Sequence, residues 1–150
     1  MSDYTIESLT SSDASTVEAI RILIEQLTGR ESTFGEDDLR NTLQDSASRL
    51  FVMRHNDNIV GMITLGIYSC PTGRKVWIED VVIDRELRGK GLGQRLVEFA
   101  INYVKENLSP CSLMLPSRPS RIAANELYRK SGFEQRQTNV YKIDIKIIKQ

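Results

Sequence analysis

The sequence has few of the residues that build disulfide-linked or metal-held folds. Its 150 residues include two cysteines, one histidine and four prolines. Cys70 and Cys111 lie far apart and lack the paired spacing of metal ligands, which argues against a disulfide framework and a zinc site. We therefore expect no metal, thiols that serve mainly in packing, and a cytoplasmic location.

The sequence also lacks a net charge and a long apolar run. Twenty basic residues balance twenty acidic ones, so no overall field attracts nucleic acid or anionic lipid. The longest uncharged run, residues 58–73, is shorter than the roughly 20 apolar residues of a membrane-spanning helix. The first residues lack the basic start and apolar stretch of a secretory signal. We expect neither a nucleic acid nor a membrane partner.

The composition is that of an ordinary globular protein. Hydrophobic residues make up 40% and charged residues 27% of the chain, which excludes intrinsic disorder and is enough for one hydrophobic core. No internal repeat, low-complexity segment or linker interrupts the sequence. We therefore predict a single domain over residues 1–150.

Hydrophobic spacing predicts the order of the elements. Apolar residues recur at steps of three and four in the predicted helices, which span residues 13–28, 35–46, 92–107 and 120–130. Shorter β-rich runs predict strands at residues 4–9, 50–53, 59–68, 76–83 and 111–115, with two final strands within 133–147. Hairpins combined with a strand-helix-strand crossover indicate an α/β (α+β) fold, with a mixed, mostly antiparallel sheet of about seven strands flanked by about four helices.

The segment from residue 81 to 93 joins a predicted strand to an amphipathic helix and contains the most informative motif. Glycines at 89, 91 and 93 allow the backbone to turn tightly and to approach a ligand, and the free amides of the helix N-terminus attract negative charge. Arg88 and Lys90 add positive charge. The segment predicts an anion site, most simply for a pyrophosphate; the alternative is a sharp turn with no ligand.

Familiar nucleotide motifs do not match this loop. The G-x-x-x-x-G-K-[ST] pattern is absent, and the G-x-G-x-x-G pattern fails because Gln94 stands at its last glycine. The loop instead resembles the acyl-CoA pyrophosphate signature of the GNAT superfamily of N-acetyltransferases, Arg/Gln-x-x-Gly-x-Gly/Ala, through Arg88, Gly91 and Gly93. Residues 124–133 resemble the last helix and following strand of that family, and the order of elements agrees over nearly the whole chain.

The resemblance implies a GNAT-like fold that binds acetyl-CoA as a co-substrate. The backbone after the carboxylates of the fourth strand would hold the pantetheine arm, the glycine-rich loop would hold the pyrophosphate, and the last helix would contact the same cofactor. The implied cofactor-binding residues are Val81, Val82, Ile83, Arg88, Gly89, Lys90, Gly91, Leu92, Gly93, Asn125 and Tyr128.

Two side chains are the candidate catalytic groups. Tyr128 matches the family tyrosine that protonates the leaving thiolate, and its alternative is a core aromatic. Glu79 is the favoured base, acting directly or through a water, because a central strand seldom carries two adjacent carboxylates without a use for at least one of them. Strict alternation places Asp80 on the opposite face, but a bulge would reverse that inference, so Asp80 stays the alternative base. A solvated edge or an ion pair would also account for both carboxylates.

The resulting hypothesis is an N-acetyltransferase that transfers an acetyl group from acetyl-CoA to a primary amine by direct attack in a ternary complex. The acceptor is a small molecule or an exposed protein amine, and its pocket would include the polar loop around residues 29–37. The alternative is a catalytically inactive acyl-CoA-binding sensor or partner module. The sequence also leaves room for a homodimer.

Overall fold

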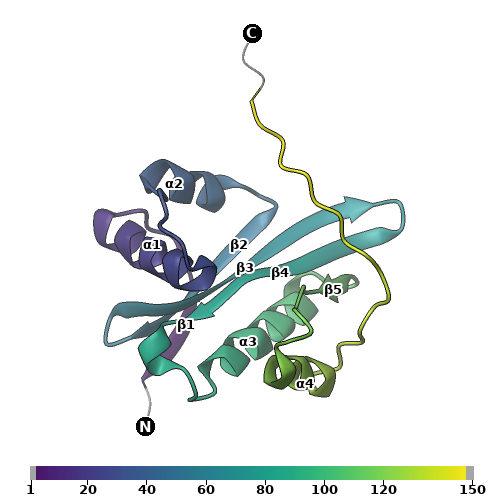
Figure 1. Ribbon diagram of the computed structural model, residues 1–150. Coiled ribbons are helices and arrows are strands. Elements are labelled where there is room, and N and C mark those ends of the chain that lie inside the picture. The colour runs from purple at the N-terminus through teal and green to yellow at the C-terminus, as the bar shows by residue number, and fades with distance from the viewer. Residues whose placement is uncertain (1–2, 148–150) are drawn as a thin grey trace. The chain divides into compact units, whose positions relative to one another are not determined.

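The computed structural model describes residues 3–147, which contain five β-strands and four α-helices (Figure 1). The strands lie in the order β1-β2-β3-β4-β5. Their bounds are Tyr4–Ser8 for β1, Ser48–His55 for β2, Asn58–Cys70 for β3, Gly73–Ile83 for β4 and Ser112–Met114 for β5. The first four strands pair antiparallel with their neighbours, and β5 pairs parallel with β4. The sheet is therefore mixed and mostly antiparallel, as predicted.

The helices agree with the predicted order. They are α1 (Ala14–Thr28), α2 (Glu36–Gln44), α3 (Leu92–Asn107) and α4 (Ile122–Lys130), and a short 3-10 turn, η1 (Arg85–Leu87), follows β4. The chain divides into two compact units. The unit up to Arg118 contains the sheet with α1, α2 and α3, and the unit from Pro119 contains α4 and an extended segment.

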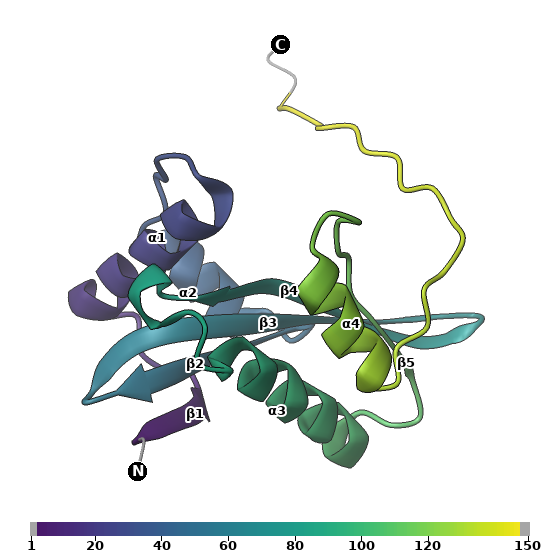
Figure 2. The same cartoon turned by 60° about the horizontal axis from the view of Figure 1, so that its bottom comes forward.

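Helices cover both faces of the sheet in the first unit, with α1 and α2 on one face and α3 on the other (Figure 2). This explains the uninterrupted apolar run in β2, because a strand covered on both faces needs no polar side. Leu50 and Val52 join the core beneath α1 and α2. Phe51 packs on α3, with ring centroids 5.0 Å from Phe99 and 4.9 Å from Tyr103.

Local signals fix the ends of several elements. The Asp13 carboxylate accepts a hydrogen bond from the Thr16 amide at 2.8 Å and caps the start of α1. Asn56 and Asp57 connect β2 to β3 with φ values of 50° and 66°. Two residues with positive φ suit the tight turn of a β-hairpin, and asparagine and aspartate tolerate that conformation better than most residues.

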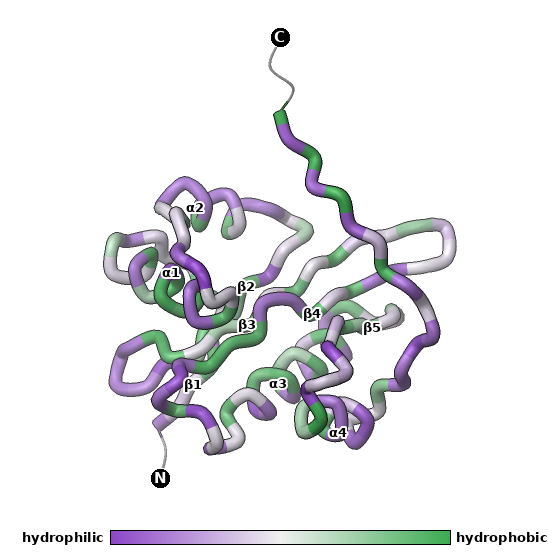
Figure 3. Tube along the Cα trace, in the orientation of Figure 1, coloured by the Kyte–Doolittle hydropathy of each residue, from purple (hydrophilic) through white to green (hydrophobic). Residues whose placement is uncertain are grey.

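The two final strands predicted between residues 133 and 147 are absent, so the prediction of about seven strands is wrong. This segment is extended and alternates hydrophobic with hydrophilic residues towards its end (Figure 3). Five apolar side chains there are more than three-quarters exposed, namely Val140, Tyr141, Ile143, Ile145 and Ile147. Alternation predicts an extended backbone, but a strand also needs a hydrogen-bonded neighbour. In addition, residues 134–139 contain no apolar side chain that could pack against a hydrophobic core.

Candidate functional site

The two adjacent carboxylates lie at a β-bulge in the middle of β4. The register pairs Glu79 with Thr64 and Val82 with Met62, so Asp80 and Val81 together oppose a single residue of β3. Asp80 has a φ of 51°, in the left-handed region that few non-glycine residues adopt. A bulge of this kind redirects the strand and its side chains. The strict alternation used to separate Glu79 from Asp80 therefore does not hold here.

Glu79 and Asp80 are both exposed residues, yet the surrounding protein removes part of the hydration of their carboxyl groups. This desolvation raises the pKa of Glu79, and the charge of Asp80 raises it further. Desolvation likewise raises the pKa of Asp80. A paired cation would lower these pKa values, so the upward direction argues against the ion-pair interpretation. A carboxylate with a raised pKa holds a proton more readily and is a stronger base at neutral pH.

The glycine-rich loop turns the chain from β4 into α3 through two left-handed residues. Gly89 has a φ of 83°, and Gly91, the N-cap of α3, has a φ of 76°. The first hydrogen bond of the helix joins the Arg95 amide to the Gly91 carbonyl at 3.2 Å. The amides of residues 92–94 therefore precede the helical ladder, which is the arrangement that favours an anion.

The side chains of this loop divide into charged and buried groups. Arg88 and Lys90 are exposed, whereas Leu92 is 4% exposed and belongs to the hydrophobic core. The guanidinium Nε of Arg88 donates to the carbonyl of Ile83 at 3.0 Å. This bond ties the loop to the end of β4, so the loop and residues 81–83 form one continuous region.

One edge of β4 is paired with β5 over only part of its length. The parallel pairs run from Lys75 with Ser112 to Trp77 with Met114, and within the described residues this pairing stops there. The second half of β4, which carries the bulge and residues 81–83, continues beyond β5. Unpaired strand edges present backbone donors and acceptors that an extended ligand can use.

The remaining site candidates belong to the second unit. Asn125 and Tyr128 lie one turn apart on α4, which begins at Ile122, two residues later than predicted. The Tyr128 ring makes an edge contact with the Phe133 ring at 6.1 Å, and the Phe133 amide donates to the Tyr128 carbonyl at 3.0 Å. These contacts fix the end of α4, which gives the core-aromatic interpretation of Tyr128 a local basis.

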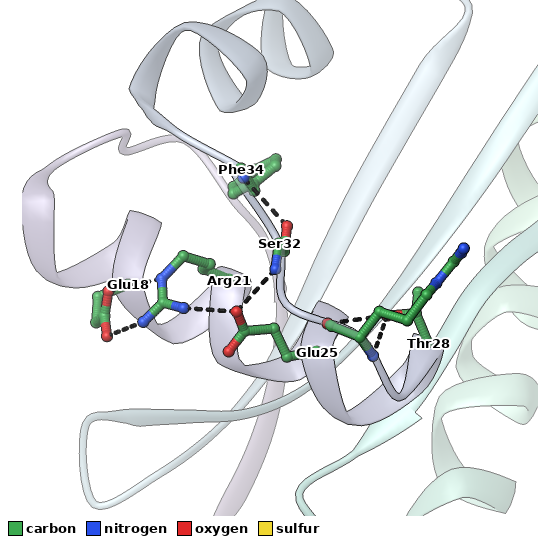
Figure 4. A network of polar contacts seen from close by, with 7 residues as sticks. Glu18, Arg21, Glu25, Thr28, Ser32 and Phe34 are labelled. Carbon is green, nitrogen blue, oxygen red and sulfur yellow. Dashed lines mark hydrogen bonds and ion pairs between the residues drawn. The ribbon is translucent and has the colours of Figure 1, made fainter.

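The polar loop after α1 is held by a side-chain network that the sequence did not reveal (Figure 4). One oxygen of Glu25 accepts hydrogen bonds from the Ser32 amide and from Arg21, both at 2.8 Å. Arg21 also pairs with Glu18. The spacing of Arg21 and Glu25 predicts an ion pair on a helix, but no spacing signal predicts the contact with the loop.

The comparisons with known proteins establish the family. Residues 17–133 match the sequence model of the Acetyltransferase (GNAT) family. The chain therefore belongs to this family, in agreement with the resemblance seen in its motifs. Streptothricin acetyltransferase A of Bacillus subtilis (strain 168) is 28% identical in an alignment of 106 residues that covers 67% of this chain and 56% of that protein. The chain thus matches little more than half the length of this relative.

Solved structures show the same fold. An aminoglycoside acetyltransferase from an uncultured soil metagenomic sample has a TM-score of 0.81 at 18% identity, covering 95% of this chain and 97% of that one. The glucosamine-6-phosphate N-acetyltransferase of Arabidopsis thaliana has a TM-score of 0.75 at 21% identity, covering 93% and 97%. At such identities the likeness extends to the fold alone.

The described part of the chain contains neither a metal-binding cluster of side chains nor a helix suited to a membrane. In residues 3–147, no group of three or more histidine, cysteine, aspartate or glutamate side chains is placed to hold a metal ion. No helix of this part of the chain is long and apolar enough to cross a membrane.

Proposed function

We propose that this chain is an acetyl-CoA-dependent N-acetyltransferase, built as one GNAT-like domain over residues 1–150. The observation that carries the proposal is the left-handed glycine turn into α3, with Arg88 beside it bonded to Ile83 at the end of β4. Together these features offer free amides and positive charge next to an open strand edge. A pyrophosphate followed by a long, amide-containing arm fits that combination.

In this proposal the loop and the strand edge bind different parts of the cofactor. The amides at the start of α3, with Arg88 and Lys90, bind the pyrophosphate, and Gly89 and Gly91 provide the turn. The backbone of residues 81–83 pairs with the pantetheine arm as an added strand would. Asn125 and Tyr128 of α4 supply the remaining contacts to the cofactor.

The proposed reaction is direct transfer within a ternary complex. Glu79, or Asp80 as the alternative, removes a proton from the acceptor ammonium, directly or through a water. The amine nitrogen then bonds to the acetyl carbon, and the bond between that carbon and the cofactor sulfur breaks. Tyr128 gives its proton to the departing thiolate, and the second proton that the nitrogen loses on forming the amide passes to solvent, from which Tyr128 regains its own. The raised pKa of both carboxyl groups supports a base in this position.

The acceptor is proposed to be a primary amine of a small molecule or of an exposed protein terminus or side chain. The loop around residues 29–37 would form part of its pocket. The names of the relatives make streptothricin and aminoglycosides the first compounds to try. Neither nucleic acid nor membrane is a proposed partner, and the cytoplasm remains the proposed location.

The experiment is a screen for amine-dependent release of CoA from acetyl-CoA, detected by a thiol reagent. Release that depends on an added amine supports the transferase. Tyr128→Phe should then lower kcat while the Kd for acetyl-CoA stays nearly unchanged, because the variant keeps the ring and loses only the acidic proton. Tyr103→Phe, which removes a phenol hydroxyl from α3, is the matched control and should keep the wild-type rate.

The same screen addresses the alternative function. A chain that binds acetyl-CoA tightly but releases CoA with no amine in a broad panel would instead be a sensor or partner module. Comparing Glu79→Gln with Asp80→Asn would identify the base. The substitution that removes the base should abolish the rise of kcat/KM with pH, and the other substitution should keep that rise. An unaltered rate in Tyr128→Phe would remove this residue as the acid.

A further inference from the structure

Two consecutive side chains in the last turn of α1 hold two different loops. Glu25 accepts a hydrogen bond from the Ser32 amide of the loop after α1 at 2.8 Å (Figure 4). Gln26 accepts one from the Arg85 amide at 2.8 Å through its Oε1, across 59 residues of sequence. The second bond connects α1 to the segment between β4 and the glycine-rich loop.

The Arg85 amide needs a partner from outside its own turn. Arg85 is the first residue of η1, where an amide has no preceding carbonyl of the helix to bind. Asp84 provides for the next two amides: its carboxylate accepts from Glu86 at 3.2 Å, and its carbonyl accepts from Leu87 at 2.9 Å. The side chain of Gln26 provides the acceptor for the amide that Asp84 does not serve.

The Arg85 peptide in turn sets the start of the glycine-rich loop. The Arg88 amide donates to the Arg85 carbonyl at 3.5 Å, and the Arg88 side chain donates to the Ile83 carbonyl at 3.0 Å. The backbone of Arg88 is thus joined to α1 through a single intermediate residue. If Arg85 shifts, Arg88 and the turn that follows it lose the hydrogen bond to the Arg85 carbonyl that helps to hold them in place.

We propose that Gln26 is a positioning residue for the anion-binding loop. Its amide oxygen fixes the Arg85 peptide before the ligand arrives. The glycine-rich loop therefore loses less conformational entropy when the pyrophosphate binds. Gln26 does not touch the cofactor in this account. The inference rests on the proposed function, because it assumes that the loop from Arg88 to Gly93 binds the pyrophosphate of CoA.

The test is titration calorimetry of CoA with the full chain and three variants. Gln26→Met keeps the length of the side chain but removes the amide oxygen, and should weaken CoA binding by about two- to tenfold, as expected for the loss of one hydrogen bond. Gln26→Glu keeps an acceptor and should restore most of the affinity at high salt, where its added charge is screened. With an acceptor amine, Gln26→Met should raise the KM for acetyl-CoA and leave kcat unchanged.

Glu25→Leu is the control at the neighbouring residue, because it removes the bond to the Ser32 loop and the ion pair with Arg21 but leaves the Arg85 amide bonded to Gln26. It should leave the affinity for CoA unchanged. Equal weakening by Glu25→Leu and Gln26→Met would overturn the inference, since it would indicate general loosening of α1. Wild-type affinity in Gln26→Met would overturn it too, while the proposed function would stand. Absence of CoA binding by the folded wild-type chain would overturn both.

Discussion

Replacing Gly61 by alanine should destabilise the protein at a specific contact beneath the proposed cofactor edge. Gly61 lies on β3 opposite Ile83 of β4. A Cβ at this position would come within 2.7 Å of the Ile83 Cδ1 and 3.1 Å of the Val82 carbonyl oxygen. The Ile83 side chain can rotate away, but the carbonyl belongs to the backbone of the sheet and can move only with the strand.

The expected cost follows from overpacking a filled core. Such substitutions typically cost about 1–3 kcal/mol, which for a chain of this size lowers the melting temperature by roughly 2–12 °C. The measurement is urea and thermal unfolding followed by circular dichroism. Because Val82 and Ile83 would shift, acetyl-CoA should also bind more weakly to the variant than to the wild-type protein.

Gly66→Ala is the control on the same strand. A Cβ at Gly66 would meet no atom within 4 Å, and the new side chain also restricts the unfolded chain. The stability of this variant should therefore stay unchanged or rise by up to about 1 kcal/mol. Gly61→Ala could also unfold at the same urea concentration as Gly66→Ala. That result would refute the inference that β3 and β4 approach each other too closely at Gly61 to accommodate a Cβ.

Three further predictions concern the core, a helix cap and the bulge. Phe51→Ala should lower the free energy of unfolding by about 3–5 kcal/mol, since this buried ring packs between Phe99 and Tyr103; a loss below 1 kcal/mol in urea unfolding would contradict that packing. Hydrogen bonds from Thr16 hold the pKa of Asp13 well below its usual range, so its charge stabilises the fold above the ordinary aspartate pKa. Asp13→Ala should thus lower the urea midpoint at pH 7, and the difference should shrink as the pH falls through the depressed pKa of the folded state. Desolvation raises the pKa of Asp80, so ionisation of this group opposes folding; Asp80→Asn should raise the midpoint at pH 7, and the gain should vanish below the ordinary aspartate range, where both states are protonated.

Most of the sheet and the four helices of residues 3–147 could be predicted because their signals are local. The three- and four-residue spacing in α1, with Asp13 before it and Gly29 after it, needs no information from the rest of the chain. The turn at Asn56 and Asp57 is specified by its own residue types. The final strands could not be predicted in the same way, because alternation from Tyr141 to Ile147 says nothing about which edge would pair with it.

The backbone geometry of the candidate site, like that of the fold, was predictable where it depends on a short stretch of sequence. Arg88, Gly91 and Gly93 form a contiguous motif, and the structure shows the turn into α3 that the motif requires. The bulge at Asp80 depends on register between two strands, which no single strand encodes. The contact of Gln26 with the Arg85 amide depends on how α1 packs beside β4, so spacing along the sequence cannot reveal it.

The most direct test of the central claim is the thermal shift caused by acetyl-CoA, with ATP and NAD as controls. A ligand at 100 times its Kd adds about 2.7 kcal/mol to the stability of the folded state, or roughly 5–11 °C for a chain of this size. We expect a rise of this order with acetyl-CoA that ATP and NAD do not reproduce. No rise with acetyl-CoA, in a preparation shown to be folded, would contradict it.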